Sequence, residues 1–338
     1  GIYFMSVELL NFIETVLNGL MSGVMYSLVA LGFVLIFKAS GVFNFAQGVF
    51  ALFAALTLVG YQTGQVPFAH LINELFGTNY HNWYASMPNF LAIILTMITM
   101  IALAWIIERL VLKHLVNQDP IILFMATIGL AFVLEGVGDL MWGSDVKVLD
   151  VGIPSGGSMW LEEATIGLAA EGSDYYGMYI DVLNVWATVI AVILVITLAL
   201  FSQYTKTGRA LRAVADDHQA ALSVGISLRT IWILVWAISG FIAMVAGIMW
   251  GTESGVQFSL SLIALKALPV LILGGFTSIP GAIIGGLLIG VGEKLAEIYI
   301  GGYFETGALE NWFAYVMALV FLLFRPQGLF GDKIIERV

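Results

Sequence analysis

The chain has 338 residues, of which 60% are hydrophobic and only 11% are charged, and its formal net charge at pH 7 is -10. A soluble domain carries about 25% charged residues, and a water-facing surface could not cover this much apolar area. The composition therefore indicates a membrane protein. The negative charge argues against a nucleic-acid partner, and the lack of cysteine excludes disulfides, thiolate metal sites and a cysteine nucleophile.

Apolar segments of spanning length recur along the chain and predict an all-α, polytopic transmembrane helical bundle with about nine membrane segments. The segments cover residues 11–37, 42–60, 89–108, 120–142, 183–201, 230–251, 262–276, 281–300 and 311–324. We expect them to form a single membrane domain over 1–338. The segment 262–276 is short and contains Pro269 and two adjacent glycines, so it is either a full crossing or a broken, re-entrant helix.

The distribution of Lys and Arg predicts the orientation of these segments. Ten of the thirteen basic residues lie at Lys38, in the loops 109–119 and 202–229, or in the tail after residue 324. Nine alternating segments place these four regions on one side of the membrane. We therefore expect a cytoplasmic C-terminus, an external N-terminus and external loops at 61–88 and 143–182, in a multi-pass protein of the inner (plasma) membrane.

Two amides follow the first apolar segment, in the stretch Gly41-Val42-Phe43-Asn44-Phe45-Ala46-Gln47-Gly48. A broken helix start leaves backbone donors free to line a cavity, and Asn44 and Gln47 could bind a polar solute there without carrying charge. Alternatively, both amides cap the helix or tie it to its neighbours. We expect the first helix break at Gly48. A second break is expected around Gly274, Gly275, Pro280 and Gly281.

Ionisable residues inside apolar segments are costly, so they mark either a transport pathway or an ion pair. Glu135 lies within 120–142 and Lys266 within 262–276. They are candidates for the pathway, and an ion pair between them is conceivable. The charges of Glu293, Lys294 and Glu297 lie toward the end of 281–300, where we expect them to reach the membrane surface.

The strongest motif is the segment 205–226, which lies in the basic loop 202–229. Residues Arg209 to Leu222 are predicted to form a short helix that Gly225 ends. A helix with mixed polar and apolar faces suits docking into a groove on a soluble partner; the alternative is a helix on the membrane surface. The candidate docking residues are Thr207, Gly208, Arg209, Leu211, Arg212, Asp216, Asp217 and Gly225.

With these motifs in order, the chain resembles the H-type permease subunits of branched-chain amino acid ABC importers over nearly its whole length. The resemblance rests on four stretches in the same order as in that family. They are Asn18-Gly19-Leu20 with Gly23 and Tyr26-Ser27-Leu28, then Asn44-Phe45-Ala46-Gln47-Gly48, then Thr207-Gly208-Arg209-Ala210 with Gly225-Ile226, and finally Gly274-Gly275-Phe276-Thr277-Ser278-Ile279-Pro280-Gly281-Ala282.

The resemblance implies a pore subunit that pairs with a second, similar permease, with two cytoplasmic ATPases and with an extracytoplasmic solute-binding protein. It also implies that 205–226 is the coupling helix. Gln47 and Val49 stand where many relatives have histidine and glutamate, which leaves open urea, short amides or another small organic solute instead of branched-chain or other amino acids.

The chain has no G-x-x-x-x-G-K-[ST] loop, so ATP and Mg are expected on the partner subunits. No nucleophile elbow or paired catalytic carboxylate appears, and the four histidines show no metal spacing. We therefore expect no catalytic residues, metal or cofactor in this chain. An ion-coupled secondary transporter is the remaining alternative, and it would need a buried ionisable relay, for which Glu135 is the candidate.

Overall fold

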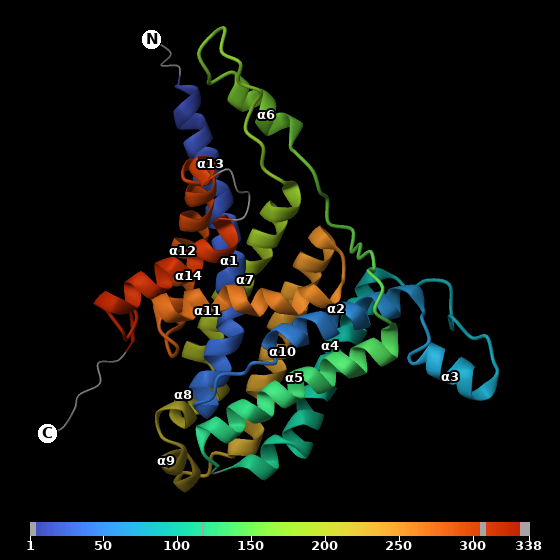
Figure 1. The fold of residues 1–338 in the computed structure, drawn as a ribbon. Coiled ribbons are helices and arrows are strands. Elements are labelled where there is room, and N and C mark those ends of the chain that lie inside the picture. The colour runs from blue at the N-terminus through green and yellow to red at the C-terminus, as the bar shows by residue number, and fades with distance from the viewer. Residues whose placement is uncertain (1–4, 117, 305–308, 332–338) are drawn as a thin grey trace, which may run out of the picture. The chain divides into compact units, whose positions relative to one another are not determined.

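The computed structural model describes residues 5–116, 118–304 and 309–331. In this described part the fold is all-α (Figure 1). The longer helices are α1 (Val7–Ser40), α2 (Gln47–Thr63), α4 (Asn89–Leu110), α5 (Pro120–Trp142), α7 (Val182–Tyr204), α10 (Leu228–Ser254), α11 (Ile263–Gly274), α12 (Ile279–Tyr299) and α14 (Leu309–Phe324). The shorter ones are α3 (Ala69–Phe76), η1 (Leu112–Leu115), α6 (Met159–Ile166), α8 (Lys206–Asp216), α9 (His218–Ser223), η2 (Phe258–Leu262) and α13 (Gly301–Phe304).

Each of the nine predicted segments falls on a helix. Among the described residues, six helices are long and apolar enough to cross a membrane, namely Val7–Ser40, Asn89–Leu115, Pro120–Trp142, Val182–Tyr204, Leu228–Ser254 and Ile279–Tyr299. Helix α2 has 17 residues, α11 has 12 and α14 has 16. The protein is thus a multi-pass membrane protein, whereas the count of nine crossings and the orientation of the termini remain predictions.

The chain forms two compact units, each built from separate stretches. Unit 1 draws on the described residues of 1–28, 153–196 and 266–338, and unit 2 on those of 29–152 and 197–265. Helices α1, α7 and α11 continue through the boundaries between these stretches.

Unit 2 is organised around α2, which packs against α4, α5 and α10. Most of α2 is buried, as expected of a helix that is apolar all round. Gly247 of α10 makes the close crossing possible, because a Cβ at that position would run into the carbonyl oxygen of Ala51. Phe50 and Trp236 then meet edge to face, with ring centroids 5.6 Å apart.

Unit 1 contains the crossing of α1 with α12, which is made through small residues. A Cβ added to Gly23 would lie 2.6 Å from the carbonyl oxygen of Gly286, and one added to Gly19 would lie 2.7 Å from Cα of Val291. Ser27 Oγ also lies 3.0 Å from the carbonyl oxygen of Ile283. Small residues at four-residue steps thus let the two helix backbones approach closely.

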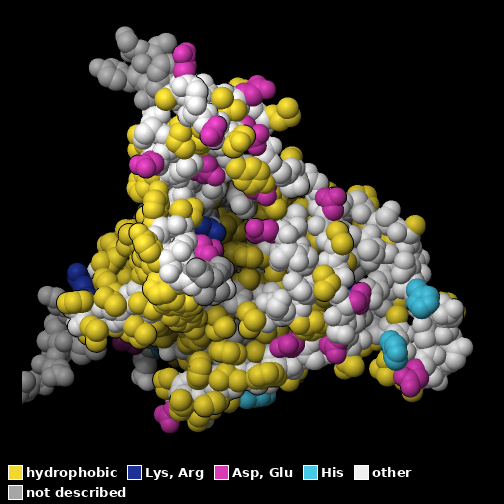
Figure 2. Space-filling view, turned by 45° about the horizontal axis from the view of Figure 1, so that its top comes forward, with side chains coloured by type: hydrophobic (Ala, Val, Ile, Leu, Met, Phe, Trp, Pro, Cys, Tyr) yellow, Lys and Arg dark blue, Asp and Glu magenta, His cyan; other side chains and the backbone are white. Residues whose placement is uncertain are grey.

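The segment between α5 and α7 carries α6 and all the acidic residues of the predicted external loop 143–182. Figure 2 shows several acidic side chains gathered at the top of its view, where α6 lies. Ser158 caps α6 by accepting a hydrogen bond from Leu161 N, and Asp181 Oδ1 accepts one from Gly156 N at 3.0 Å. This part of the loop is therefore folded.

Candidate translocation site and coupling segment

The break between α1 and α2 covers residues 41–46. Gly41 has a φ of 70°, and Asn44 Oδ1 accepts a hydrogen bond from Ala46 N at 3.0 Å. This local turn starts α2 at Gln47, later than the predicted residue 42. Gly48 does not mark the break itself, because it lies inside the first turn of α2, where a Cβ would run into the Ser261 carbonyl.

Gln47 ties α2 to α10 and lies close to α1. Its side chain is 2% exposed, its Nε2 donates to the Ser239 carbonyl at 3.1 Å, and its Oε1 accepts from Ser239 Oγ at 2.6 Å. Ser239 Oγ is also 3.2 Å from the carbonyl oxygen of Gly32. A Cβ at Gly32 would run into the Gln47 amide, so this glycine makes room for the glutamine.

Asn44 is fully buried, and its Nδ2 has no hydrogen-bond partner among the described residues. An unsatisfied buried donor costs about 1–3 kcal/mol, so a partner for Asn44 Nδ2 would stabilise this break. In this conformation both predicted pathway amides are enclosed by protein. Nothing in the sequence marked Ser239 as the partner of Gln47, because a lone serine in an apolar helix is common.

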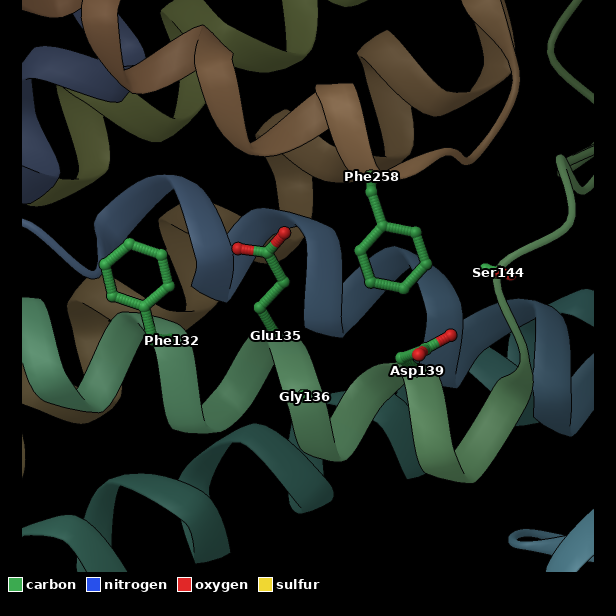
Figure 3. Close-up of a pocket in the computed structure, with 6 residues that line it drawn as sticks. All are labelled: Phe132, Glu135, Gly136, Asp139, Ser144 and Phe258. Atoms are coloured by element: carbon green, nitrogen blue, oxygen red, sulfur yellow. The ribbon is translucent and has the colours of Figure 1, made fainter.

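Glu135 lines an open pocket of about 350 Å³ in unit 2 (Figure 3). Glu135 and Asp139 lie one turn apart on α5 and therefore on the same face of that helix, and Phe258 of η2 extends toward them. The pocket is lined by Phe132, Glu135, Gly136, Asp139, Ser144 and Phe258. Its acidic and aromatic lining could hold a cationic or ammonium group. The spacing of Glu135 and Asp139 was a signal that sequence inspection missed.

Lys266 lies in unit 1, where its partner is Glu293 rather than Glu135. Lys266 Nζ is 3.1 Å from Glu293 Oε2 and donates to the Glu310 carbonyl at 3.2 Å. Tyr26 Oη donates to Glu293 Oε1 at 3.0 Å. Lys266 of α11 therefore pairs with Glu293 of α12 and not with Glu135. Tyr26 of α1 adds a hydrogen bond to the same carboxylate.

The expectation that Glu293 reaches the membrane surface was wrong, because its side chain is only 1% exposed. A second ion pair lies beside the first: Lys294 Nζ is 3.0 Å from Glu310 Oε1, and Glu297 Oε2 accepts from Glu310 N at 2.8 Å. The charges near the end of α12 are thus paired with Lys266 of α11 and with Glu310 at the start of α14. Their number was visible in the sequence, but their pairing was not.

The second helix break lies between α11 and α12. Helix α11 ends at Gly274, and Gly275 has a φ of 99°, a conformation that glycine adopts without strain. Ser278 caps α12, with Gly281 N donating to its hydroxyl at 3.0 Å, and Pro280 lies in the first turn. Gly274 and Gly281 face each other so closely that a Cβ on either would run into the backbone of the other.

The segment 205–226 forms two helices rather than the single predicted helix. Thr205 caps α8 by accepting from Gly208 N at 2.9 Å. Asp217, at the junction, caps α9 by accepting from Gln219 N at 2.8 Å and from Ala220 N at 3.1 Å. An aspartate that caps the next helix stops the one before it, which explains the break at Asp217. Gly225, with a φ of 84°, follows the end of α9.

The candidate docking residues divide into buried and exposed groups. Leu211 is 4% exposed and Gly208 is buried against Ser202, so neither offers a surface to a partner, contrary to the expectation for Leu211. The exposed residues are Thr207, Arg209, Arg212, Asp216, Asp217 and Gly225. Arg212 Nη2 is 3.4 Å from the Gln203 carbonyl, a long contact that leaves the rest of its guanidinium available.

A nearby ion pair joins α4 to α10: Arg229 Nε is 3.2 Å from Glu108 Oε2, and the carboxylate is almost fully buried. In the part of the chain that the structure describes, no group of three or more His, Asp or Glu residues is placed to hold a metal ion.

The long apolar helices define a multi-pass membrane protein, and comparison with known proteins gives its class. The family model for the branched-chain amino acid transport system permease component matches residues 15–325. The chain belongs to this family and is the transmembrane permease subunit of an ABC transporter.

Three relatives show how far the similarity extends. The LivH high-affinity branched-chain amino acid permease of Escherichia coli is 27% identical, over 99% of this chain and 100% of LivH. BraD of Pseudomonas aeruginosa is 27% identical over 98% of this chain and 99% of BraD. The probable LivH of Methanocaldococcus jannaschii is 30% identical over 90% of this chain and 88% of its own length.

Proposed function

We propose that this chain forms half of the translocation pathway of an importer for branched-chain or other amino acids. The observation that carries the proposal is the match over the full length of permeases named for branched-chain amino acid transport. A fructose import permease of Bifidobacterium longum also matches, but over only 41% of this chain. The full-length matches favour an amino acid over a sugar, urea or a short amide.

Within this pathway, Asn44, Gln47, Glu135 and Lys266 are the proposed solute-related groups. An amino acid carries an ammonium and a carboxylate, and the Glu135 and Asp139 carboxylates beside Phe258 would attract the ammonium end. The unpartnered Asn44 Nδ2 is a donor available to the carboxylate end when the helices separate. Lys266 would act indirectly, by holding α11 against α12.

Free energy would enter through partner chains. The proposed assembly contains a second homologous permease, two cytoplasmic ATPases that bind ATP and Mg, and an extracytoplasmic solute-binding protein, in the inner membrane with the C-terminus cytoplasmic. The proposed coupling surface is the exposed part of α8 and α9. Arg209 and Arg212 are its anchors because arginine is enriched among residues that dominate binding energy, and Asp216 lies at the rim.

The coupling proposal is tested with Arg212→Glu. Losing one central anchor costs about 2 kcal/mol or more, which corresponds to roughly a thirtyfold weaker ATPase docking. The measurement is co-purification of the ATPase chains and ATP-driven uptake of leucine into proteoliposomes. Arg325→Glu is the matched control, because Arg325 is also exposed but lies outside 205–226. If the Arg212→Glu variant retains both its ATPase and its uptake, the coupling assignment is wrong.

The solute assignment is tested separately with the unmodified transporter. Leucine, isoleucine and valine should each compete for uptake of labelled leucine, whereas urea and acetamide should not. Uptake of urea with no uptake of leucine would show that the amino acid assignment is wrong and that the solute is urea or a similar small amide. Replacing Asn44 with leucine should then lower uptake of the true solute while leaving membrane insertion unchanged.

A further inference from the structure

Helix α3 has two chemically distinct faces, and none of its residues is buried. Its polar residues His70, Asn73 and Glu74 lie on one side, and its apolar residues lie on the other, because residues three and four apart share a helix face. On the apolar side, Leu71 is 44%, Leu75 is 69% and Phe76 is 74% exposed. So much exposed apolar surface on one short helix points to an unfilled contact.

The start of α3 is hydrogen-bonded to the end of a membrane span. Phe68 N donates to the Met141 carbonyl at 2.9 Å, and Gln65 Nε2 donates to the Trp142 carbonyl at 3.1 Å. Trp142 is the last residue of α5, a helix of 23 residues that is long and apolar enough to cross a membrane. At about 1.5 Å per residue such a helix matches the hydrocarbon thickness of a bilayer. Helix α3 therefore begins at the depth where lipid tails give way to headgroups.

The orientation of α3 is fixed at both ends. Phe68 has a φ of 58° and is the only non-glycine residue with positive φ among the described residues; such a conformation persists only when its surroundings hold it. After the helix, Asn73 Oδ1 accepts from Tyr80 N at 2.9 Å and from Thr78 Oγ1 at 3.0 Å. These bonds determine which side of the helix the apolar residues occupy.

The surroundings of α3 match a lipid surface. Tyr80 is 61% and Trp83 is 72% exposed, and these amphipathic rings are enriched at membrane–water interfaces. Phe90, at the start of α4, is 77% exposed and Leu140, near the end of α5, is 59% exposed, so two membrane spans also carry exposed apolar side chains near their ends. The segment 61–88 contains no Lys or Arg, so attraction to anionic headgroups is not part of the contact.

We propose that α3 is an interfacial helix that lies in the headgroup region of the bilayer, with Leu71, Leu75 and Phe76 in contact with acyl chains. Its partner is the uncharged apolar part of the lipid, because the segment offers aromatic and aliphatic side chains but no cation. Helix α3 would then hold the loop between α2 and α4 at a constant depth.

The chain contains no cysteine, so single cysteines can be introduced into the full-length protein without other changes. Leu75→Cys reports on the apolar face and Glu74→Cys on the polar face of the same helix. Each variant is labelled with an environment-sensitive fluorophore and placed in phosphatidylcholine nanodiscs, with Leu71→Cys as a second apolar site if the first fails to fold. Quenching by spin labels near the top of the lipid chains is compared with quenching by iodide in water.

We expect the label at residue 75 to be quenched several-fold more strongly by the lipid spin label than by iodide, and the label at residue 74 to show the reverse. Adding phosphatidylglycerol should leave both ratios unchanged. Equal iodide quenching at the two positions would overturn the proposal in favour of a free, solvated helix. Protection of residue 75 from both quenchers would also overturn it, since a protein surface would then cover the apolar face.

Discussion

Two contacts, one in each unit, hold a polar group among apolar helices with different chemistry. In unit 1 the Glu293 carboxylate is enclosed and paired with Lys266 Nζ at 3.1 Å. In unit 2, which also holds the Arg229–Glu108 ion pair, Gln47 and Ser239 exchange two hydrogen bonds without any charge. An unpaired buried charge costs far more than an unpaired amide, so separating the charged tie is much more costly. The neutral tie is therefore the better candidate for a contact that opens and closes during transport.

The strongest test of this comparison removes one charge from unit 1. Lys266→Met leaves Glu293 buried without its cation, and we expect a loss of about 3–5 kcal/mol of stability. Denaturant unfolding in detergent micelles measures the change. The double variant Lys266→Met with Glu293→Leu should recover most of the loss, because it removes both charges. A double variant as unstable as the single one would show that the charges are not coupled.

A second test asks whether helix packing, rather than polar ties, distinguishes the units. Gly290→Ala in unit 1 and Gly247→Ala in unit 2 each push a Cβ into backbone of a neighbouring helix, so each should cost about 2 kcal/mol. Gly129→Ala is the control, because a Cβ there meets nothing within 4 Å; its stability should be equal or slightly higher. Unequal losses at residues 290 and 247 would mean that packing also differs between the units.

The neutral tie is tested with Gln47→Leu, which removes both hydrogen bonds to Ser239. We expect the free energy of unfolding to fall by about 1.5 kcal/mol in the same assay. This loss is smaller than that for Lys266→Met, because no unpaired charge is left in the apolar interior. Thr57→Val on the same helix is the control: Thr57 Oγ1 is buried without a hydrogen-bond partner among the described residues, so its loss should be neutral or stabilising. If Gln47→Leu costs as much as Lys266→Met, the comparison fails.

The smallest effect concerns an ion pair at the protein surface. The Lys147 ammonium donates a hydrogen bond to Asp145 and holds the pKa of that carboxyl below its ordinary value of 3.8. A lowered folded pKa gives stability that is present above the unfolded value and is lost as the pH falls through the folded one. Stability should therefore fall slightly below about pH 4, and Asp145→Asn should remove that part of the dependence. Because the Asp145 side chain is 77% exposed, the effect is small.

Much of this fold follows from the hydropathy of the chain. Runs of apolar residues predicted all nine helical segments, and Gly274, Gly275 and Pro280 marked the turn between α11 and α12, because these residue types have narrow backbone preferences. The start of α2 was misplaced because the Asn44 side chain accepts a hydrogen bond from the backbone N of Ala46, which extends the break.

Tertiary partners were the part that local patterns did not reveal. The pairing of Lys266 with Glu293 joins residues 27 positions apart, and that of Gln47 with Ser239 joins residues 192 apart. No periodicity within one helix encodes which face of a distant helix it will meet. The split of 205–226 at Asp217 was in principle visible, since aspartate both ends and caps helices, but the helix-forming composition on either side favoured one continuous helix.

The close fit of Gly32 against the Gln47 amide has a consequence for sequence variation. A Cβ at residue 32 would meet the side chain at residue 47, so these two positions share one volume. A shorter side chain at 47 would leave room for alanine or serine at 32, whereas glutamine at 47 requires glycine at 32. We therefore expect positions 32 and 47 to covary across the family. We also expect Gln47→Ser alone, with no other substitution, to rescue a Gly32→Ala variant.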